Sequence, residues 1–487
     1  MRRLVVLFCF AVALLPAQED DLPAQMKSMI QAYSILEQNA ADPISSEQAL
    51  FQGAIPGLLR KLDPHSVFFD EDQFEQLKKM EASTQKGFGS VVSLLPGRII
   101  VLQVAPGTPS AKAGLQPGDE LAAVNGYDVS KLDLEQITQL LTQSRQQQVM
   151  LYVRRQGAGR FLQFTLVPEE MQSPSVDRAF FIGAGVGYIR VSSFDENTGK
   201  DIHAAIEKLG GNHLLGLVLD FRNNPGGLVT AALETASMFL KPGQKIVTVR
   251  GRHVEEKSES VLPDATPYNF KLAILMNEKS ASAAEIVAGA MQDHDRATIL
   301  GEPSYGKGLV QSVIPLSEGA GLALTTALYY TPSGRSIQKP LDASRFALAA
   351  TTAHPNKQSE FHTDGGRKVT GGGGIQPDIT VLPAPMTRLR MALDASGSFT
   401  NFATEYLRTN KITLDFEVTP ALLAAFQVFA SERGIQPRVG DWTTERDFIS
   451  SRLKTEIFNQ AFGVEKGDEV EAQRDPVIQK ALDVVGS

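Results

Sequence analysis

The sequence predicts an α/β multidomain protein in which helical regions flank a small strand-rich unit and a larger layered core. Three observations support this prediction. Apolar residues recur at spacings of three and four near both ends of the chain. Short alternating runs follow one another between residues 87 and 168, as in a strand-rich unit. Between 171 and 382, apolar runs alternate with helical patterns, which is typical of a layered α/β core.

The composition of the 487-residue chain is that of an ordinary globular protein, with 43% hydrophobic and 21% charged residues. It excludes a wholly disordered chain, a collagen and a multi-span membrane protein. The formal net charge is −8 and the sequence contains no basic block. Because binding to nucleic-acid phosphates needs clustered positive charge, we expect no nucleic-acid partner.

Residues 1–17 have the pattern of a secretory signal peptide, with two arginines before an apolar run from Leu4 to Ala17. The run is shorter than the ~20 residues of a spanning helix. We therefore expect export to the periplasm or another extracytoplasmic compartment, soluble or peripheral to the membrane. The only cysteine, Cys9, lies in this run after the bulky Phe8, which argues against a lipoprotein. The mature chain would then have no disulfide, no cysteine nucleophile and no thiolate metal site.

Residues 18–83 are predicted to form a helical segment. One helical pattern includes Met26, Met29 and Ile30, and a second runs from Ala49 to Leu62. The turn Leu62-Asp63-Pro64-His65-Ser66 follows, and then another short helix. No chemistry is evident in this segment, and His65 beside a proline is interpreted as a turn residue rather than a ligand.

Residues 84–168 are predicted to form a strand-rich unit with two helices. It opens with the glycine-rich turn Gly87-Phe88-Gly89, and Asn125-Gly126 is a tight turn between strands. The expected strands are 99–104, 120–124, 149–154 and 161–167, and the expected helices are 111–115 and 134–141.

Residues 169–383 are predicted to form the layered α/β core, and residues 384–487 a second helical region. The expected core strands are 186–191, 215–219, 245–249, 272–276 and 297–300, and the expected helices are 198–209, 229–240 and 283–292. The polar segment from Asp342 to Gly374 is expected to be a loop excursion.

Two runs that follow core strands carry candidate chemistry. Asp220-Phe221-Arg222-Asn223-Asn224-Pro225-Gly226-Gly227 ends in a glycine pair, which can present bare backbone N–H groups to an oxyanion. An ordinary tight turn is the alternative. Asn277-Glu278-Lys279-Ser280-Ala281-Ser282-Ala283 opens a helix, where the partial positive charge favours an oxyanion. One of the two serines could simply be a helix cap.

The third run, Gly301-Glu302-Pro303-Ser304-Tyr305-Gly306-Lys307-Gly308, contains a lysine between glycines. It resembles a phosphate loop, but Gly308 stands where that loop needs Ser or Thr. A buried lysine with a lowered pKa would serve better as the base for a serine.

Together the three runs resemble the C-terminal processing peptidases, which are tail-specific serine proteases with a Ser–Lys dyad. Similar motifs in the same order extend over almost the whole chain, including Leu62–Ser66, Tyr330–Gln338 and Gly372–Asp378. The resemblance implies a crotonase-like layered protease core that cleaves proteins near their C-termini. It also implies a possible homo-oligomer through the terminal helical regions.

The resemblance assigns Ser282 as the nucleophile, Lys307 as the general base and Gln311 as the residue that orients the lysine. Gln311 would lie one helical turn after Lys307 if that segment is helical. The oxyanion would be held by backbone N–H groups of Ala283 and of Gly226 or Gly227, with the choice between the glycines left open.

The strand-rich unit resembles a PDZ domain, most specifically in the run from Ser110 to Leu121. The resemblance implies that Gly87, Phe88 and Gly89 bind the C-terminal tail of a protein substrate. PDZ domains do this by adding the peptide to a sheet edge. We expect the domain either to tether the substrate or to gate the catalytic site, and favour gating.

Three alternatives remain at the level of the sequence. A Ser–His pair would use His294, which follows the serine helix, as its base. A catalytically inert PDZ-containing scaffold would only recruit exported proteins. A different enzyme on the same layered core, such as a hydratase relative, would not need a PDZ domain. No metal and no cofactor are expected, because no paired histidines at ligand spacing occur.

Overall fold

The structure is a computed structural model that describes residues 21–486, except 43, 82–83, 96, 146, 156, 173, 343–344 and 347–359. The predicted signal peptide and Cys9 lie outside the described residues, and the excursion after Asp342 is described only in part. Within the described ranges, no helix combines the length and the apolar character needed to cross a membrane.

A mainly parallel sheet forms the centre of the core, with the strand order β10-β11-β12-β15-β16-β21. The edge strand β10 is antiparallel to β11, and the following strands pair in parallel. The strands are β10 (Val176–Gly183), β11 (Val186–Val191), β12 (Gly216–Asp220), β15 (Lys271–Met276), β16 (Thr298–Gly301) and β21 (Ile379–Thr380). Strands that are buried on both faces read as continuous apolar runs, which is why the sequence predicted β11, β12, β15 and β16. It did not predict β10 or β21, and the expected core strand 245–249 belongs to a second sheet.

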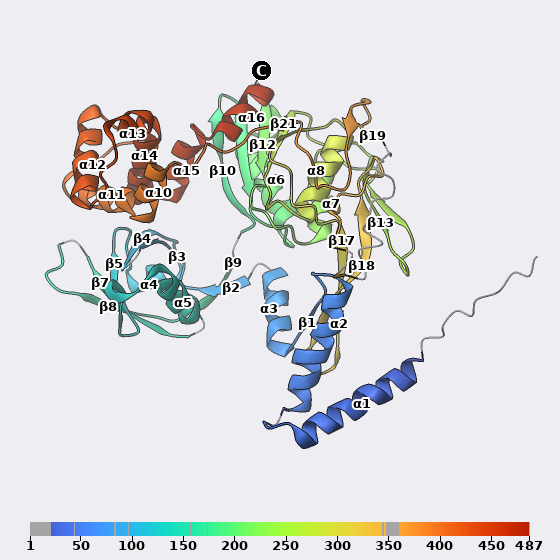
Figure 1. Ribbon diagram of the computed structural model, residues 1–487. Helices are drawn as coiled ribbons and strands as arrows, with labels where there is room; N and C mark the ends of the chain where they lie inside the picture. The colour runs from blue at the N-terminus through green and yellow to red at the C-terminus, as the bar shows by residue number, and fades with distance from the viewer. Residues whose placement is uncertain are drawn as a thin grey trace, which may run out of the picture.

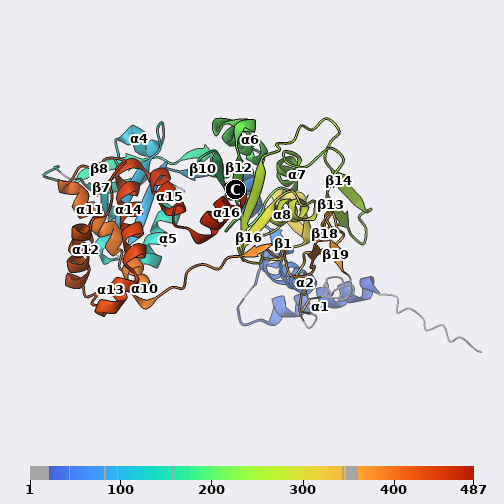
Figure 2. The ribbon, with the colours of Figure 1, turned by 90° about the horizontal axis from the view of Figure 1, so that it is seen from above.

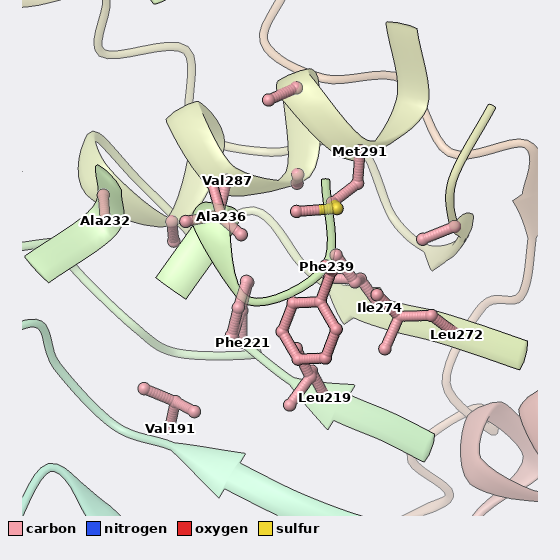
Figure 3. Close-up of a cluster of buried hydrophobic side chains, with 14 of the residues drawn as sticks. Val191, Leu219, Phe221, Ala232, Ala236, Phe239, Leu272, Ile274, Val287 and Met291 are labelled. Carbon is pink, nitrogen blue, oxygen red and sulfur yellow. The ribbon is translucent and has the colours of Figure 1, made fainter. Parts of the chain in front are cut away.

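Helices cover both faces of this sheet, as the layered α/β prediction requires (Figures 1 and 2). One face packs against α6 (Thr198–Lys208), α7 (Val229–Ser237) and α8 (Ala283–Asp293). Successive strand residues point to opposite faces, so Leu219 and Ile274 face these helices. They belong to one buried cluster with Phe239, which follows α7, and Met291 of α8 (Figure 3). The alternate residues of the same strands pack against α16 (Pro476–Gly486).

A second, antiparallel sheet lies beside the core and carries Gln311 on its strand β17. Its order is β1-β18-β13-β14, with β17 paired to β18. Its strands are β1 (Val67–Phe69), β13 (Lys245–Arg250), β14 (Lys257–Ser260), β17 (Leu309–Pro315) and β18 (Gly321–Tyr330). A two-stranded pair, β19 (Phe361–His362) and β20 (Lys368–Val369), lies in the described part of the excursion.

The N-terminal segment is helical, as predicted, and it is joined to the core by a strand. Its elements are α1 (Leu22–Asn39), the π-helical turn η1 (Gln48–Ala54), α2 (Ile55–Leu62) and α3 (Glu71–Glu81). Between α2 and α3, β1 pairs with β18, with Val67 opposite Ala323. Helix α1 projects away from the rest of the chain in Figure 1 and buries none of its residues.

The strand-rich unit contains two helices against one sheet, as expected. Its elements are β3 (Ser90–Leu95), β4 (Arg98–Val104), α4 (Pro109–Ala113), β5 (Glu120–Val124), β6 (Tyr127–Asp128), η2 (Val129–Lys131), α5 (Leu134–Ser144), β7 (Val149–Arg154) and β8 (Leu162–Leu166). Asn125 and Gly126 both have positive φ, 50° and 84°, as a two-residue primed hairpin turn requires. The unit is connected to the rest of the chain through the antiparallel ribbon of β2 (Thr84–Gly87) and β9 (Glu169–Gln172).

The C-terminal region is helical and contacts the strand-rich unit. Its elements are α10 (Arg388–Ala395), α11 (Ser398–Thr409), α12 (Pro420–Glu432), α13 (Val439–Thr444), α14 (Arg446–Phe462) and α15 (Val464–Ala472). Leu95, Ile100 and Leu102 of the strand-rich unit pack against Val464, and the Arg98 guanidinium donates to the side chain of Asn401. The boundaries after 83, 168 and 383 stay predictions, and α16 lies on the core sheet rather than with α10 to α14.

Candidate active site

Ser282 lies at the turn between β15 and α8, where it is half-buried. Its φ is 55° and its ψ is −115°, a conformation that a non-glycine residue rarely adopts. Such strain costs roughly 1–3 kcal/mol and is characteristic of functional sites. The neighbouring Ser280 is fully buried, and its hydroxyl donates to the carbonyl of Phe221 at 2.7 Å. Ser280 therefore fixes the turn, and Ser282 is the N-cap residue of α8, with its backbone N–H held by Glu285.

Lys307 lies in the loop between β16 and β17, and its Nζ donates to Oε1 of Gln311 at 2.7 Å. Burial lowers the pKa of Lys307 below its ordinary value, while the carboxylates of Asp63 and Glu285 oppose that shift. A lysine with a lowered pKa is more often neutral near pH 7 and can then accept a proton.

The segment that carries Gln311 is a strand, so the conditional prediction of a helical turn after Lys307 is wrong. Gln311 belongs to β17, which pairs with β18. A register shift between Val310 and Gln311 interrupts that ladder. Such a bulge re-aims side chains, and Gln311 contacts the lysine from the strand.

A single buried carboxylate, that of Glu285 on α8, ties the serine turn to the lysine loop. Its Oε2 accepts from the backbone N–H of Ser282 and from that of Lys307, both at 2.9 Å. The backbone nitrogens of Ser282 and Lys307 therefore lie within twice 2.9 Å of each other. Oε1 accepts from Gly306 N at 2.7 Å and from the Ser304 hydroxyl at 2.5 Å. Burial raises the pKa of Glu285, and these hydrogen bonds counteract the rise by stabilising the carboxylate.

The glycine pair lies directly against the serine turn. A Cβ added to Gly226 would lie 2.7 Å from the Cβ of Ser282, so only glycine permits this approach. Gly226 N donates to Oδ1 of Asn224 at 2.8 Å. The N–H of Gly226 is thus engaged, and Gly227 is the member of the pair whose N–H remains for an oxyanion.

Ala283 is the first residue of α8, where backbone N–H groups lack partners within the helix. It is completely buried. Ala281 N donates to Asn224 O at 2.9 Å and joins the serine turn to the glycine turn. The structure therefore brings the predicted oxyanion residues and the predicted nucleophile together.

His294 is at the far end of the helix that Ser282 begins, so the Ser–His alternative with His294 as its base is wrong. Helix α8 spans Ala283–Asp293, and a rise of ~1.5 Å per residue separates its ends by about 16 Å. Both ring nitrogens of His294 are also engaged, by Asp364 Oδ2 and by Lys245 O, each at 2.7 Å.

Residues of the N-terminal segment lie at this site, which the sequence interpretation missed. The His65 carbonyl accepts from Nε2 of Gln311 at 2.5 Å. Burial and the charge of Lys307 both lower the pKa of His65. His65 is a turn residue, as interpreted, but its turn contacts the lysine network. The motif Leu62–Ser66 is visible in the sequence, but its position beside Gln311 depends on the fold.

The glycine-rich turn of the strand-rich unit borders a groove of about 440 Å³. Gly87, Phe88 and Gly89 line it, opposite Leu141 of α5. Gly89 has a φ of 75°, and a Cβ there would lie 2.2 Å from that of Thr108, so the turn requires glycine. Among the described residues, no group of three or more metal-ligating side chains is assembled.

The chain is similar to known proteases and to PDZ domains in its sequence. The sequence matches peptidase family S41 over residues 185–342 and the PDZ domain over residues 100–155. A carboxy-terminal-processing protease from Bartonella bacilliformis is 38% identical over 61% of this chain and 68% of that protein. A carboxyl-terminal-processing protease from Synechocystis is 31% identical over 69% of this chain and 80% of that protein. A solved photosystem II D1 C-terminal processing protease is 25% identical, with a TM-score of 0.40 over 76% of this chain and 89% of that one.

Proposed function

Because the chain belongs to the carboxy-terminal processing proteases of peptidase family S41, we propose that it is an exported serine endopeptidase. Its substrates are proteins, which it cleaves near their C-termini with a Ser282–Lys307 dyad. The observation that carries this proposal is the shared carboxylate of Glu285, which holds the backbones of both residues. The lowered pKa of Lys307 supports its role as the base.

In this mechanism, Nζ of neutral Lys307 takes the proton of the Ser282 hydroxyl as Oγ bonds to the scissile carbonyl carbon. The carbonyl electron pair moves to oxygen, where the N–H groups of Ala283 and Gly227 stabilise the negative charge. The lysine ammonium then protonates the leaving amine as the C–N bond breaks. Water, deprotonated by the same lysine, releases the acyl group and restores the serine.

Gln311 orients the lysine. Its Oε1 accepts an N–H from Nζ, so the lone pair of the neutral amine is directed away from the glutamine. Since a base acts only when its lone pair faces the proton, this contact supports a positioning role for Gln311.

The PDZ groove recognises the tail of the substrate in this proposal. Its apolar lining, which includes Val91 and Val92, favours an apolar terminal residue. The backbone of the Gly87–Gly89 turn would bind the terminal carboxylate, and β3 would pair with the peptide. We favour a PDZ domain that moves between a blocking and an open position, because a bound tail can shift such an equilibrium through its differential affinity.

The test is incubation of the mature chain with an unfolded protein, beside its Ser282→Ala variant, with the fragments read by mass spectrometry. Fragments from the parent alone support the proposal. Fragments from both would refute the assigned nucleophile, and fragments from neither would favour the inert scaffold.

A further inference from the structure

A turn outside the catalytic core, residues 63–66, is built around one buried carboxylate. Asp63 is completely buried. Its Oδ1 accepts from the backbone N–H groups of His65 and Ser66 at 2.7 and 2.8 Å, and its Oδ2 accepts from the Ser66 hydroxyl at 2.6 Å. An Asp that accepts from the backbone two and three residues later fixes the turn in one conformation.

A hydrogen bond and strand pairing connect the same turn to the sheet that carries Gln311. The hydroxyl oxygen of Ser66 accepts from Thr325 N at 3.1 Å, and β1 continues from the turn along β18. Thr325 is the β18 partner of Gln311. The position of the His65 carbonyl relative to Gln311 is therefore set by Asp63, Ser66 and the strand pairing.

The His65 carbonyl determines which way the Gln311 amide faces. A carbonyl oxygen can only accept, so it must receive the NH₂ group of the amide. It does so at 2.5 Å, which leaves Oε1 of Gln311 to accept from Lys307 Nζ at 2.7 Å. With the amide reversed, its NH₂ group would face the lysine and compete for its lone pair.

The turn also contributes charge. The carboxylates of Asp63 and Glu285 raise the pKa of Lys307 against the effect of burial. His65 interacts with the lysine as well, and its own pKa is lowered by burial and by the lysine. Loss of the Asp63 charge would therefore lower the pKa of Lys307.

We propose that the turn Asp63–Ser66 is a positioning element of the protease site, which orients Lys307 through the His65 carbonyl and the Gln311 amide. The inference rests on the proposed function and extends it: the catalytic unit includes part of the N-terminal segment. Neither Asp63 nor Ser66 performs chemistry, since each acts through another residue.

A double-mutant cycle tests the geometric part. Ser66→Ala, Gln311→Ala and the double variant are compared for kcat and KM on one protein substrate. We expect each single change to lower kcat about five- to tenfold with little change in KM, as the loss of one hydrogen bond implies. The double variant should be no slower than the slower single one. If the two losses multiply, the turn does not act through Gln311 and the proposal is overturned.

The pH profile of Asp63→Asn tests the electrostatic part and keeps the proposal falsifiable if Ser66→Ala does not fold. Because Asn is isosteric but uncharged, the acidic limb of kcat/KM should move to lower pH. Asp70→Asn is the matched control, since Asp70 is an exposed residue of the same segment that accepts from Gln73 N. It should leave the profile unchanged. An unshifted limb in Asp63→Asn would overturn the role of its charge.

Ser282→Ala serves as the blank in both experiments. If the blank still cleaves, the proposed nucleophile is wrong, whatever the turn does. If the blank is inactive while the cycle is additive and the limb is unshifted, only the role of the turn fails.

Discussion

Replacing Gly226 with alanine tests whether the contact between the glycine turn and the serine turn is needed for catalysis. The new Cβ would lie 2.7 Å from the Ser282 Cβ and 2.7 Å from the Ala281 carbonyl oxygen. Real atoms do not approach so closely, so the serine turn must move. A displacement of about 1 Å in a catalytic group lowers the rate about 100-fold. We therefore expect kcat/KM to fall by about that factor.

Gly226→Ala also strains the backbone. Gly243→Ala is the control that separates this backbone strain from the steric contact with Ser282. Gly226 has a φ of 97°, and Gly243 has a φ of 79° with no heavy atom within 4 Å of an added Cβ. Alanine should destabilise both variants by roughly 1–3 kcal/mol through strain. Only Gly226→Ala should also lose activity.

The assay is kcat/KM on an unfolded model protein, with urea unfolding of each variant to measure the stability cost. Gly243→Ala should keep the activity of the parent. If the activity of Gly226→Ala lies within about threefold of that of Gly243→Ala, then close approach of the glycine to Ser282 does not control catalysis, and the geometric reasoning is wrong.

Further predictions concern the lysine, the dependence of activity on metal ions and the C-terminal tail of the substrate. Lys307→Ala should abolish proteolysis and Gln311→Ala should only weaken it, since orientation is part of the lysine's task; robust cleavage by Lys307→Ala would exclude the dyad. Burial lowers the pKa of Lys307 below its ordinary value of 10.5, so the protonated lysine reduces the free energy of unfolding of the protein. Lys307→Met should therefore raise the free energy of unfolding near pH 7, and that gain should shrink as the pH approaches 10.5, as urea unfolding at several pH values would measure. EDTA and thiol reagents should leave the activity of the mature chain unchanged; loss that zinc or calcium restores would contradict the metal-free mechanism. Amidating the C-terminus of a model substrate should slow its cleavage, and equal rates for acid and amide would refute tail recognition. Deletion of Gly87 to Pro168 should speed cleavage of short peptides if the PDZ domain gates the site, and should leave it unchanged if the domain only tethers the substrate.

The parts of the fold that could be predicted from the sequence are those with local signals. Buried parallel strands are continuous apolar runs, and α6, α7 and α8 follow them with helical periodicity. The serine, lysine and glycine runs each follow such a strand, so their clustering at one edge of the core was foreseeable. The remoteness of His294 was foreseeable too, because it lies a whole helix away from Ser282.

The remaining features depend on contacts between distant parts of the chain. The hydrogen bond from Gln311 to the His65 carbonyl joins residues 246 positions apart and uses a backbone oxygen, which has no sequence signature. Which of Gly226 and Gly227 has its backbone N–H occupied depends on where the Asn224 side chain points. The packing of α16 against the core sheet has the same origin, because an amphipathic helix does not specify which apolar surface it covers.

The ribbon of β2 and β9 makes the PDZ unit an insertion whose two ends meet. Gly87 lies opposite Glu169 in this ribbon, and the Cα atoms of such antiparallel partners are only ~4.5–5.5 Å apart. A two-residue hairpin loop at this point would therefore keep the separation of the flanking segments, although it would remove the contacts of the unit with Asn401 and Val464. Another domain with adjacent termini can be grafted at the same point. If the PDZ unit reads the substrate tail, as proposed, a chimera that carries a different PDZ unit at this point should cleave a different set of substrates with the same Ser282 and Lys307.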